Sequence, residues 1–228
     1  IREIVTDPKT HGLLYIVKND AGEGVAVRSS WNGAKPKIVF ASPLSNWNPI
    51  SLEDGRVFFT LKPADNVSGF AYELKSDGTI APRVQDVPGL TFLPHSSSAA
   101  VLFGASAGET LALFVQASDK SRVVPLDIRT VADKCAWDPA NKNPVAYCAV
   151  PQFVISKTFL NDWYRGAIHT NDSWWRVDAE SGAVEQVFSP SESDGAIDVE
   201  NPVIDSGGER IAFMNATDKT LWLLRLLK

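Results

Sequence analysis

A short phrase that recurs five times along the chain constrains its fold more than any other feature of the sequence. Each copy consists of a short apolar strand, a polar turn and a second apolar strand. The residues that open these turns are Asp7, Glu53, His95, Asp138 and Asp205. Their spacings are 46, 42, 43 and 67 residues, so all but the last fall within the roughly 40–50 residue period of propeller blades.

A third and a fourth strand follow each of the first four copies. The third strands read GVAVRSS, GFAYELKS, TLALFVQA and SWWRVDAE, and the fourth strands read PKIVFAS, PRVQDV, SRVVPLD and AVEQVFS. Short alternating strands separated by Gly, Asn, Asp and Pro turns are typical of antiparallel sheets. The pattern therefore predicts an all-β fold, a β-propeller built from four-stranded antiparallel blades.

The repeats divide a single predicted propeller domain, residues 1–228, into five blades. Their approximate limits are 1–45, 46–88, 89–132, 133–199 and 200–228. The fifth repeat stops after its third strand, TLWLLRLL, and lacks an outer strand. Three interpretations stay open: a three-stranded last blade, a strand donated by a segment before Ile1 or by another chain, or a fragment of a propeller with more blades. An open strand edge invites pairing.

Composition excludes several classes of protein. Hydrophobic residues make up 44% and charged residues 21% of the chain, which is ordinary for a globular domain and unlike a disordered one. The net charge of -5 argues against a nucleic-acid partner held by overall positive charge. No apolar run approaches the roughly 20 residues that span a membrane. We therefore expect no direct membrane insertion of this segment.

The turns between first and second strands carry an acidic and glycine-containing pattern. It is clearest at residues 53–55 and 205–208, and looser at Asp7-Pro8 and Asp138-Pro139. Through this turn pattern the whole chain resembles the WD40-like and TolB-type bacterial β-propellers, in which a D-x-x-G-like turn joins the first two strands of each blade. The resemblance implies the propeller fold.

The C-terminal half is similar to a narrower group, envelope-associated propeller proteins of uncultivated bacteria. The phrases that carry this likeness are residues 134–137 (KCAW), 147–151 (YCAVP), 162–166 (DWYRG) and 221–222 (LW). Members of the group are longer chains with an N-terminal membrane anchor and further blades. The resemblance therefore implies an extracytoplasmic location, in the cell envelope or secreted, and it implies no activity.

The fourth repeat is enlarged by about 20 residues, roughly Pro151 to Thr170, between its second and third strands. The insertion places Trp163, Tyr164 and Arg165 on a loop face that we also expect to hold Trp47. Aromatic and arginine side chains suit sugar stacking or a protein contact. Two interpretations stay open, a ligand-binding surface formed by these four residues and a loop that caps its own hydrophobic core.

The two cysteines, Cys135 and Cys148, lie on the first and second strands of the fourth repeat. Reflection about the intervening turn places them directly opposite each other, with Trp137 opposite Ala146. Opposed cross-strand cysteines can form a disulfide where the backbone separation suits it. The alternative is a pair of small buried thiols in a reducing compartment. Two cysteines without further ligands make a zinc site improbable.

Three acidic residues, Glu3, Asp133 and Glu200, each stand at the start of a predicted first strand, near the expected channel mouth. Five-bladed propellers include glycosidases that use paired carboxylates. Surface or turn-capping roles explain such residues in most chains. The histidines have no metal-ligand spacing, and no nucleotide or serine-hydrolase motif occurs, so we expect no metal and no cofactor.

Three functions are compatible with these features. The leading hypothesis is a non-enzymatic extracytoplasmic module that binds a protein or glycan through its loop face. The second is a glycan hydrolase or lyase that uses Glu3, Asp133 or Glu200. The third is a structural component of a surface assembly.

Overall fold

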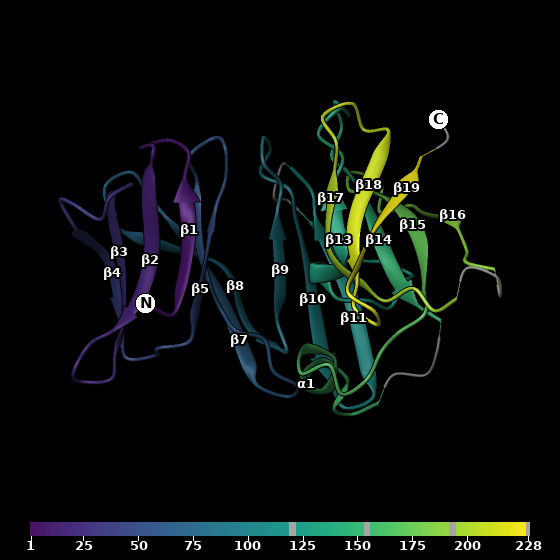
Figure 1. The fold of residues 1–228 in the computed structure, drawn as a ribbon, viewed down its shortest axis with the longest axis horizontal. Helices are drawn as coiled ribbons and strands as arrows, with labels where there is room; N and C mark the ends of the chain where they lie inside the picture. The colour runs from purple at the N-terminus through teal and green to yellow at the C-terminus, as the bar shows by residue number, and fades with distance from the viewer. Residues whose placement is uncertain (119–121, 153–155, 192–194, 227–228) are drawn as a thin grey trace. The chain divides into compact units, whose positions relative to one another are not determined.

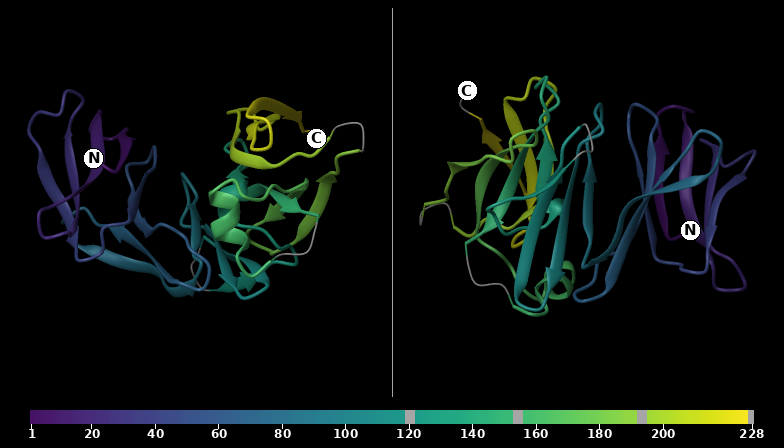
Figure 2. Two further views of the ribbon diagram at one scale, coloured as in Figure 1. Left: turned by 60° about the horizontal axis from the view of Figure 1, so that its bottom comes forward. Right: turned by 180° about the vertical axis from the view of Figure 1, so that it is seen from behind.

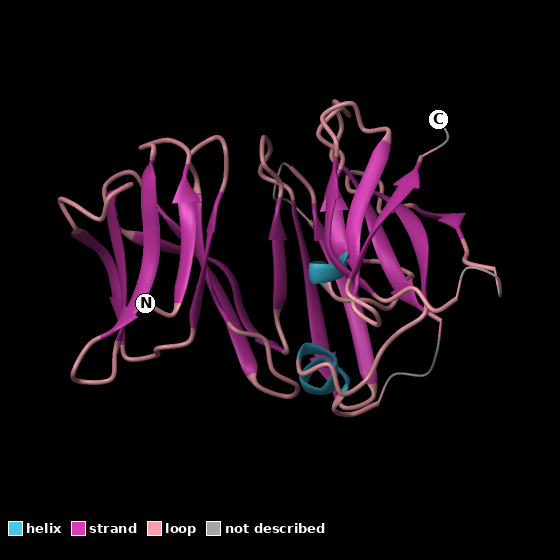
Figure 3. Ribbon diagram, viewed as in Figure 1, coloured by secondary structure: helices cyan, strands magenta, loops and turns pink. Residues whose placement is uncertain are grey.

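The computed structural model describes residues 1–118, 122–152, 156–191 and 195–226, and most of their regular structure is β-strand (Figures 1 and 3). The chain falls into two compact units. Unit 1 comprises residues 1–62 and 68–87, and unit 2 comprises residues 63–67 and 88–228.

Unit 1 contains two antiparallel sheets in which strands that follow one another in the sequence are neighbours. The first sheet consists of β1 (Glu3–Asp7), β2 (Gly12–Lys18), β3 (Gly24–Ser30) and β4 (Lys37–Ser42). The second consists of β5 (Trp47–Ser51), β6 (Val57–Leu61), β7 (Ser68–Leu74) and β8 (Ile80–Pro88).

Unit 2 contains three sheets of the same kind and two short helices. The third sheet consists of β9 (Thr91–Pro94), β10 (Val101–Ala107), β11 (Thr110–Gln116) and β12 (Val123–Pro125). The fourth consists of β13 (Cys135–Trp137), β14 (Val145–Pro151), β15 (Asp172–Asp178) and β16 (Val184–Phe188). The fifth consists of β17 (Val199–Ile204), β18 (Arg210–Asn215) and β19 (Thr220–Arg225). The helices are η1 (Ala132–Lys134) and α1 (Phe159–Tyr164).

The sheets confirm the predicted blades. Within the described ranges, the first four sheets have four strands each and the fifth has three, in simple up-and-down order. Parts of two predicted strands, Ser121 in the third repeat and Leu227 in the fifth, lie outside the described residues.

The turns between first and second strands need glycine where neighbouring turns approach closely. Gly55 has φ 84°, and a Cβ there would lie 2.4 Å from Lys9 Cδ. Gly208 has φ 64°, and a Cβ there would lie 2.3 Å from Asp138 Oδ1. Positive φ is inexpensive only for glycine, and the contacts leave no room for a side chain. The glycines in the predicted turn pattern are thus required by both the backbone and the packing.

Alternation along the strands buries side chains on both faces of the fourth sheet, which lies between the third and the fifth (Figures 1 and 2). One face joins a cluster with Leu102 and Leu113 of the third sheet, and Trp175 packs against it. The other face joins a cluster with Phe213 of the fifth sheet, and Trp174 lies at its centre. Adjacent residues on a strand point to opposite faces. Ordinary core packing therefore accounts for the tryptophan pair.

Candidate functional site

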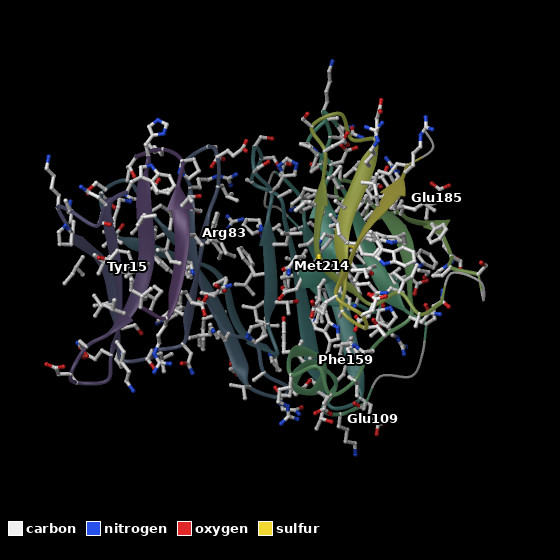
Figure 4. The ribbon with its side chains drawn as sticks, in the orientation of Figure 1. Tyr15, Arg83, Glu109, Phe159, Glu185 and Met214 are labelled. Atoms are coloured by element: carbon white, nitrogen blue, oxygen red, sulfur yellow. A yellow bond between two sulfur atoms is a disulfide. The ribbon has the colours of Figure 1, made fainter. Side chains whose placement is uncertain are left out.

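Within the insertion of the fourth repeat, of which residues 153–155 lie outside the described ranges, the short helix α1 covers a small apolar cluster with its inner side. Phe159 and Leu160 are fully buried, and Trp163 is 6% exposed. They pack against Leu111 and Val131 of the same unit. Figure 4 labels Phe159 on this helix. The inner face of the insertion thus caps a core, as one of the two interpretations of the sequence expected.

A carboxylate from far along the chain fixes the start of α1. Asp65 accepts hydrogen bonds from the backbone N–H groups of Leu160 (3.2 Å) and Asn161 (2.8 Å). The hydroxyl of Ser106 donates to the same carboxylate at 2.6 Å, and Asp65 is buried. The first N–H groups of a helix lack partners within the helix, so an acceptor there stabilises it. Local sequence patterns cannot predict this contact, because about 95 residues separate the two segments.

Beneath α1 lies a fully buried ion-pair network centred on Lys134. Its Nζ donates to Asp172 Oδ2 at 2.6 Å, to Asp198 Oδ1 at 2.7 Å and to Thr170 Oγ1 at 2.9 Å. The carbonyl oxygen of Val199 lies 3.1 Å away. The side chains of the lysine and of both aspartates are 0% exposed. A buried charge is tolerated only when it is paired and hydrogen-bonded, which this geometry achieves.

The network connects the core with α1 and with the surface. The Trp163 ring centre lies 4.5 Å from Lys134 Nζ, and its Nε1–H donates to Asp198 Oδ1 at 2.9 Å. On the other carboxylate oxygen, His169 Nδ1 lies at 3.0 Å, and this imidazole is 39% exposed. Asp198 therefore holds an exposed histidine and a buried tryptophan at the same time.

Burial and the lysine act in opposite directions on the two aspartates. Burial raises the pKa of Asp198, but the charge and hydrogen bond of Lys134, with the bonds from Thr170 and Trp163, bring the pKa below its ordinary value. At Asp172 burial dominates, and the pKa lies above the ordinary value although Lys134 opposes the shift. An ionised carboxylate can only accept hydrogen bonds, so the contact with Asp198 places a proton on His169 Nδ1.

The outer side of the insertion presents polar and aromatic groups. The Tyr164 hydroxyl donates to Asp133 Oδ2 at 2.5 Å, and Tyr164 is 43% exposed. Desolvation raises the pKa of the Asp133 carboxyl, and the hydrogen bond from Tyr164 offsets only part of this shift. Arg165 is exposed and forms an ion pair with Asp162. These side chains form what we call the α1 surface: Asp133, Tyr164, Arg165 and His169.

The four residues predicted to contact a ligand thus divide into two kinds. Trp47 is 3% exposed and packs edge-on against Phe40 in the core of unit 1. Trp163 is buried beneath α1. Both tryptophans offer almost no surface to a ligand, whereas Tyr164 and Arg165 are exposed.

The three predicted acidic residues all have polar partners. In unit 1, Glu3 forms an ion pair with Lys62. In unit 2, Glu200 forms one with Lys219 at 3.0 Å, and Asp133 accepts the bond from Tyr164. Their use as paired catalytic carboxylates stays a prediction.

The structure contains the predicted disulfide. Cys135 and Cys148 are bonded, directly opposed in the β13–β14 register, with a Cα–Cα distance of 4.0 Å. Trp137 faces Ala146, as the reflection about the turn predicted. Since Cys135 follows Lys134 directly, the bond anchors β13 next to η1, whose last residue is the centre of the ion-pair network.

Among the described residues, no three His, Cys, Asp or Glu side chains are grouped in a way that could hold a metal ion. Between Asp172 and Asp198, where a cation would fit, lies the ammonium group of Lys134. In the same part of the chain, no helix is long and apolar enough to cross a membrane.

Antiparallel sheets of this order are those of a β-propeller, and solved structures, among them TolB, support that fold. The chain resembles TolB from Acinetobacter baumannii, with 14% identity, a TM-score of 0.52, and coverage of 99% of this chain and 52% of that one. The β-propeller domain of the Trilobed protease from Pyrococcus furiosus matches with 8% identity, a TM-score of 0.60, and coverage of 99% and 68%.

An enzyme also shares the fold. An oligogalacturonate lyase in complex with manganese matches with 10% identity, a TM-score of 0.57, and coverage of 98% of this chain and 64% of that one. The chain thus spans about half of the TolB chain and just under two thirds of the lyase chain. No protein-family model and no curated protein sequence matches. At these identities the likeness concerns the fold alone.

Proposed function

We propose that this segment is a non-enzymatic binding module that works outside the cytoplasm and holds a protein or glycan ligand on the α1 surface. The observation that carries the proposal is the exposure of Tyr164 and Arg165 at α1, whose inner side is held in place by apolar contacts and hydrogen bonds. Tyrosine and arginine are enriched among the residues that dominate binding energy. Asp133 and His169 add hydrogen-bonding groups at the same surface.

Preorganisation supports this use of the insertion. Ordering a flexible side chain on binding costs about 0.5–1.5 kcal/mol, and ordering a loop costs more. Here the cap from Asp65 and the bond from Trp163 to Asp198 hold α1 before any ligand arrives. A ligand that docks on this surface would therefore meet a loop whose conformation is already fixed.

The disulfide supports the location. Such bonds persist in oxidising compartments and are rare in the cytosol. Cys135 and Cys148 are both buried, so the bond is part of the folded core. The proposed location is the cell envelope or the exterior.

The test compares binding by the native chain and by the double variant Tyr164→Ala/Arg165→Ala, on a glycan array, on isolated peptidoglycan and on an envelope-protein extract. We expect the double variant to bind at least about tenfold more weakly, as for hot-spot residues. Trp31→Ala is the matched control, because Trp31 is an exposed aromatic residue of unit 1 that lies on a hairpin turn. Equal binding by both variants and the native chain would remove the proposal.

A glycan hydrolase or lyase is the second candidate, and Asp133 is the observation in its favour. A carboxyl with a raised pKa suits a general acid, and the pKa of Asp133 is raised. Such an enzyme would release products from a panel of neutral and uronate glycans, and Asp133→Asn would abolish the release. A native chain that leaves the whole panel intact speaks against it.

A further inference from the structure

A cleft with a volume of about 610 Å³ lies between the first and the second sheet, within unit 1. The first sheet contributes Lys9, Arg28 and Lys37 to its lining, and we call these three residues the basic wall. We propose that the basic wall binds a phosphate monoester group, carried by a small molecule or by a lipid headgroup. The site belongs to unit 1 and the α1 surface to unit 2, so this proposal does not depend on the function proposed for that surface.

Two cations of the basic wall lie directly opposite each other on neighbouring strands. Arg28 of β3 pairs with Lys37 of β4 in the antiparallel register. Side chains at opposed positions are close neighbours on one face of a sheet, and like charges there destabilise the pair. An anion bound beside both side chains would offset this repulsion.

The fourth sheet carries the opposite charge at the same position. Arg28 and Arg176 are each the fifth residue of a third strand, and each follows a register shift in the pairing with the outer strand. The residue opposite Arg176 is Glu185, whereas the residue opposite Arg28 is Lys37. The fold of a blade therefore accommodates an acid at this position and does not require the lysine.

The protein neutralises the basic wall only in part. Arg28 Nε lies 2.6 Å from Oδ2 of the buried Asp7. Among the described residues, neither Lys9 nor Lys37 has an acidic side chain within ion-pair distance. Residues 24–52, which include Lys37, contain three basic residues and no acidic one. Two ammonium groups of the wall thus remain without a counter-ion from the part of the chain that the structure describes.

The acids that line the opposite side of the cleft are engaged within the second sheet. Two of them form ion pairs at 2.6 and 2.9 Å, namely Asp54–Arg56 and Glu73–Lys75. The third, Asp77, accepts hydrogen bonds from the backbone N–H and the hydroxyl of Thr79 in its own turn. The excess positive charge therefore lies on the first sheet, and an anion is attracted to that side of the cleft.

Packing holds the side chain of Lys9 beside the cleft. Its aliphatic stem lies against the neighbouring turn, where a Cβ on Gly55 would be 2.4 Å from Lys9 Cδ. Gly55 itself lines the cleft. A side chain that is already ordered loses less conformational freedom when a ligand binds. The position of this ammonium group is thus restricted before an anion arrives.

The charge and the lining of the cleft define the class of ligand. A phosphate monoester carries about 1.5 to 2 negative charges at pH 7 and offers three strong acceptor oxygens, which matches two unpaired ammonium groups better than a single carboxylate does. Lysine binds phosphate as a point charge. The described lining residues include no aromatic side chain, so they offer no stacking surface for a base or a sugar ring. The phosphate group is therefore the part of the ligand that the cleft recognises.

The experiment has two arms, which distinguish a soluble phosphate ester from a lipid headgroup. Calorimetry measures binding of glycerol 3-phosphate to the 228-residue chain, with glycerol as the neutral control. Sedimentation measures binding to phosphatidylcholine vesicles with and without phosphatidic acid, which supplies a phosphate monoester. We expect the native chain to bind the monoester in at least one arm and to bind neither control.

Two variants test the basic wall directly. Lys37→Glu introduces the acid that the fourth sheet has at this position, and should weaken binding about tenfold or more, as expected for the loss of one charge-assisted hydrogen bond. Without ligand it should melt no lower than the native chain, because an attractive pair replaces a repulsive one. Lys9→Met keeps the stem over Gly55 and removes the charge. It should weaken binding similarly, which covers the case that Lys37→Glu fails to fold.

Lys35→Glu is the matched control, because it makes the same change of charge two residues from Lys37 and outside the lining of the cleft. We expect it to bind the monoester as the native chain does. Two results would overturn the proposal. One is a native chain that binds neither glycerol 3-phosphate nor the vesicles with phosphatidic acid. The other is an equal loss of binding in Lys35→Glu and Lys37→Glu, because the attraction would then depend on net charge alone.

Discussion

The fourth and the fifth sheet share the arrangement of their first three strands but differ in the elements that are added to those strands. Both have three antiparallel strands with a tight first turn, and they share one apolar cluster. The fourth sheet adds an outer strand, a disulfide, the α1 insertion and a buried ion-pair network. The fifth sheet, as far as it is described, ends at β19 and leaves apolar side chains exposed. One repeat pattern thus yields a blade whose two faces are both covered and another whose described strands leave one apolar face exposed.

The ion-pair network should produce the largest effect on the fourth sheet. Lys134→Met leaves Asp172 and Asp198 buried without their cation, so we expect the free energy of unfolding to fall by about 3–5 kcal/mol. Urea denaturation measures this change. Lys219→Met, which removes an exposed ion pair with Glu200 in the fifth sheet, is the control and should change stability little. Similar effects of the two variants would show that burial does not distinguish them.

The disulfide should rank second. In the chain-entropy description, a cross-link of a loop this short, with a sequence separation of 13 residues, contributes about 3 kcal/mol. The double variant Cys135→Ala/Cys148→Ala should therefore unfold at lower urea concentration than the native chain. Reductant should destabilise the native chain and leave the variant unchanged. Thiol labelling of the unfolded native chain without reductant would contradict the bond.

The cap of α1 should have the smallest effect of the three and the most local one. Asp65→Ala removes the acceptor for two helix N–H groups, and loss of such a cap costs about 0.5–2 kcal/mol. Hydrogen exchange should show faster exchange at Leu160 and Asn161 and no change at the β18–β19 pair. Asp54→Ala, a turn aspartate of unit 1, is the control. Unchanged protection of α1 would mean that the apolar contacts of Phe159 hold the helix alone.

Much of the fold could be predicted from the sequence. Alternating apolar residues between glycine-containing turns marked the blades, and the symmetry of one turn located the disulfide partners. The candidate site was harder to predict. Tyr164 and Arg165 are exposed, but Trp47 and Trp163 proved to be buried, because an aromatic residue in a loop can equally well serve the core beneath it. The role of Lys134 could not be predicted, because its side-chain partners come from segments 36 to 64 residues away.

The sequence by itself determined the strands and their order within each blade. These follow from local alternation and turn residues, which act over a few positions of the chain. Only the tertiary structure decided which charges are buried together and which aromatic side chains are covered. These properties depend on segments that meet through packing, and a buried charge is defined by its neighbours in space rather than in sequence.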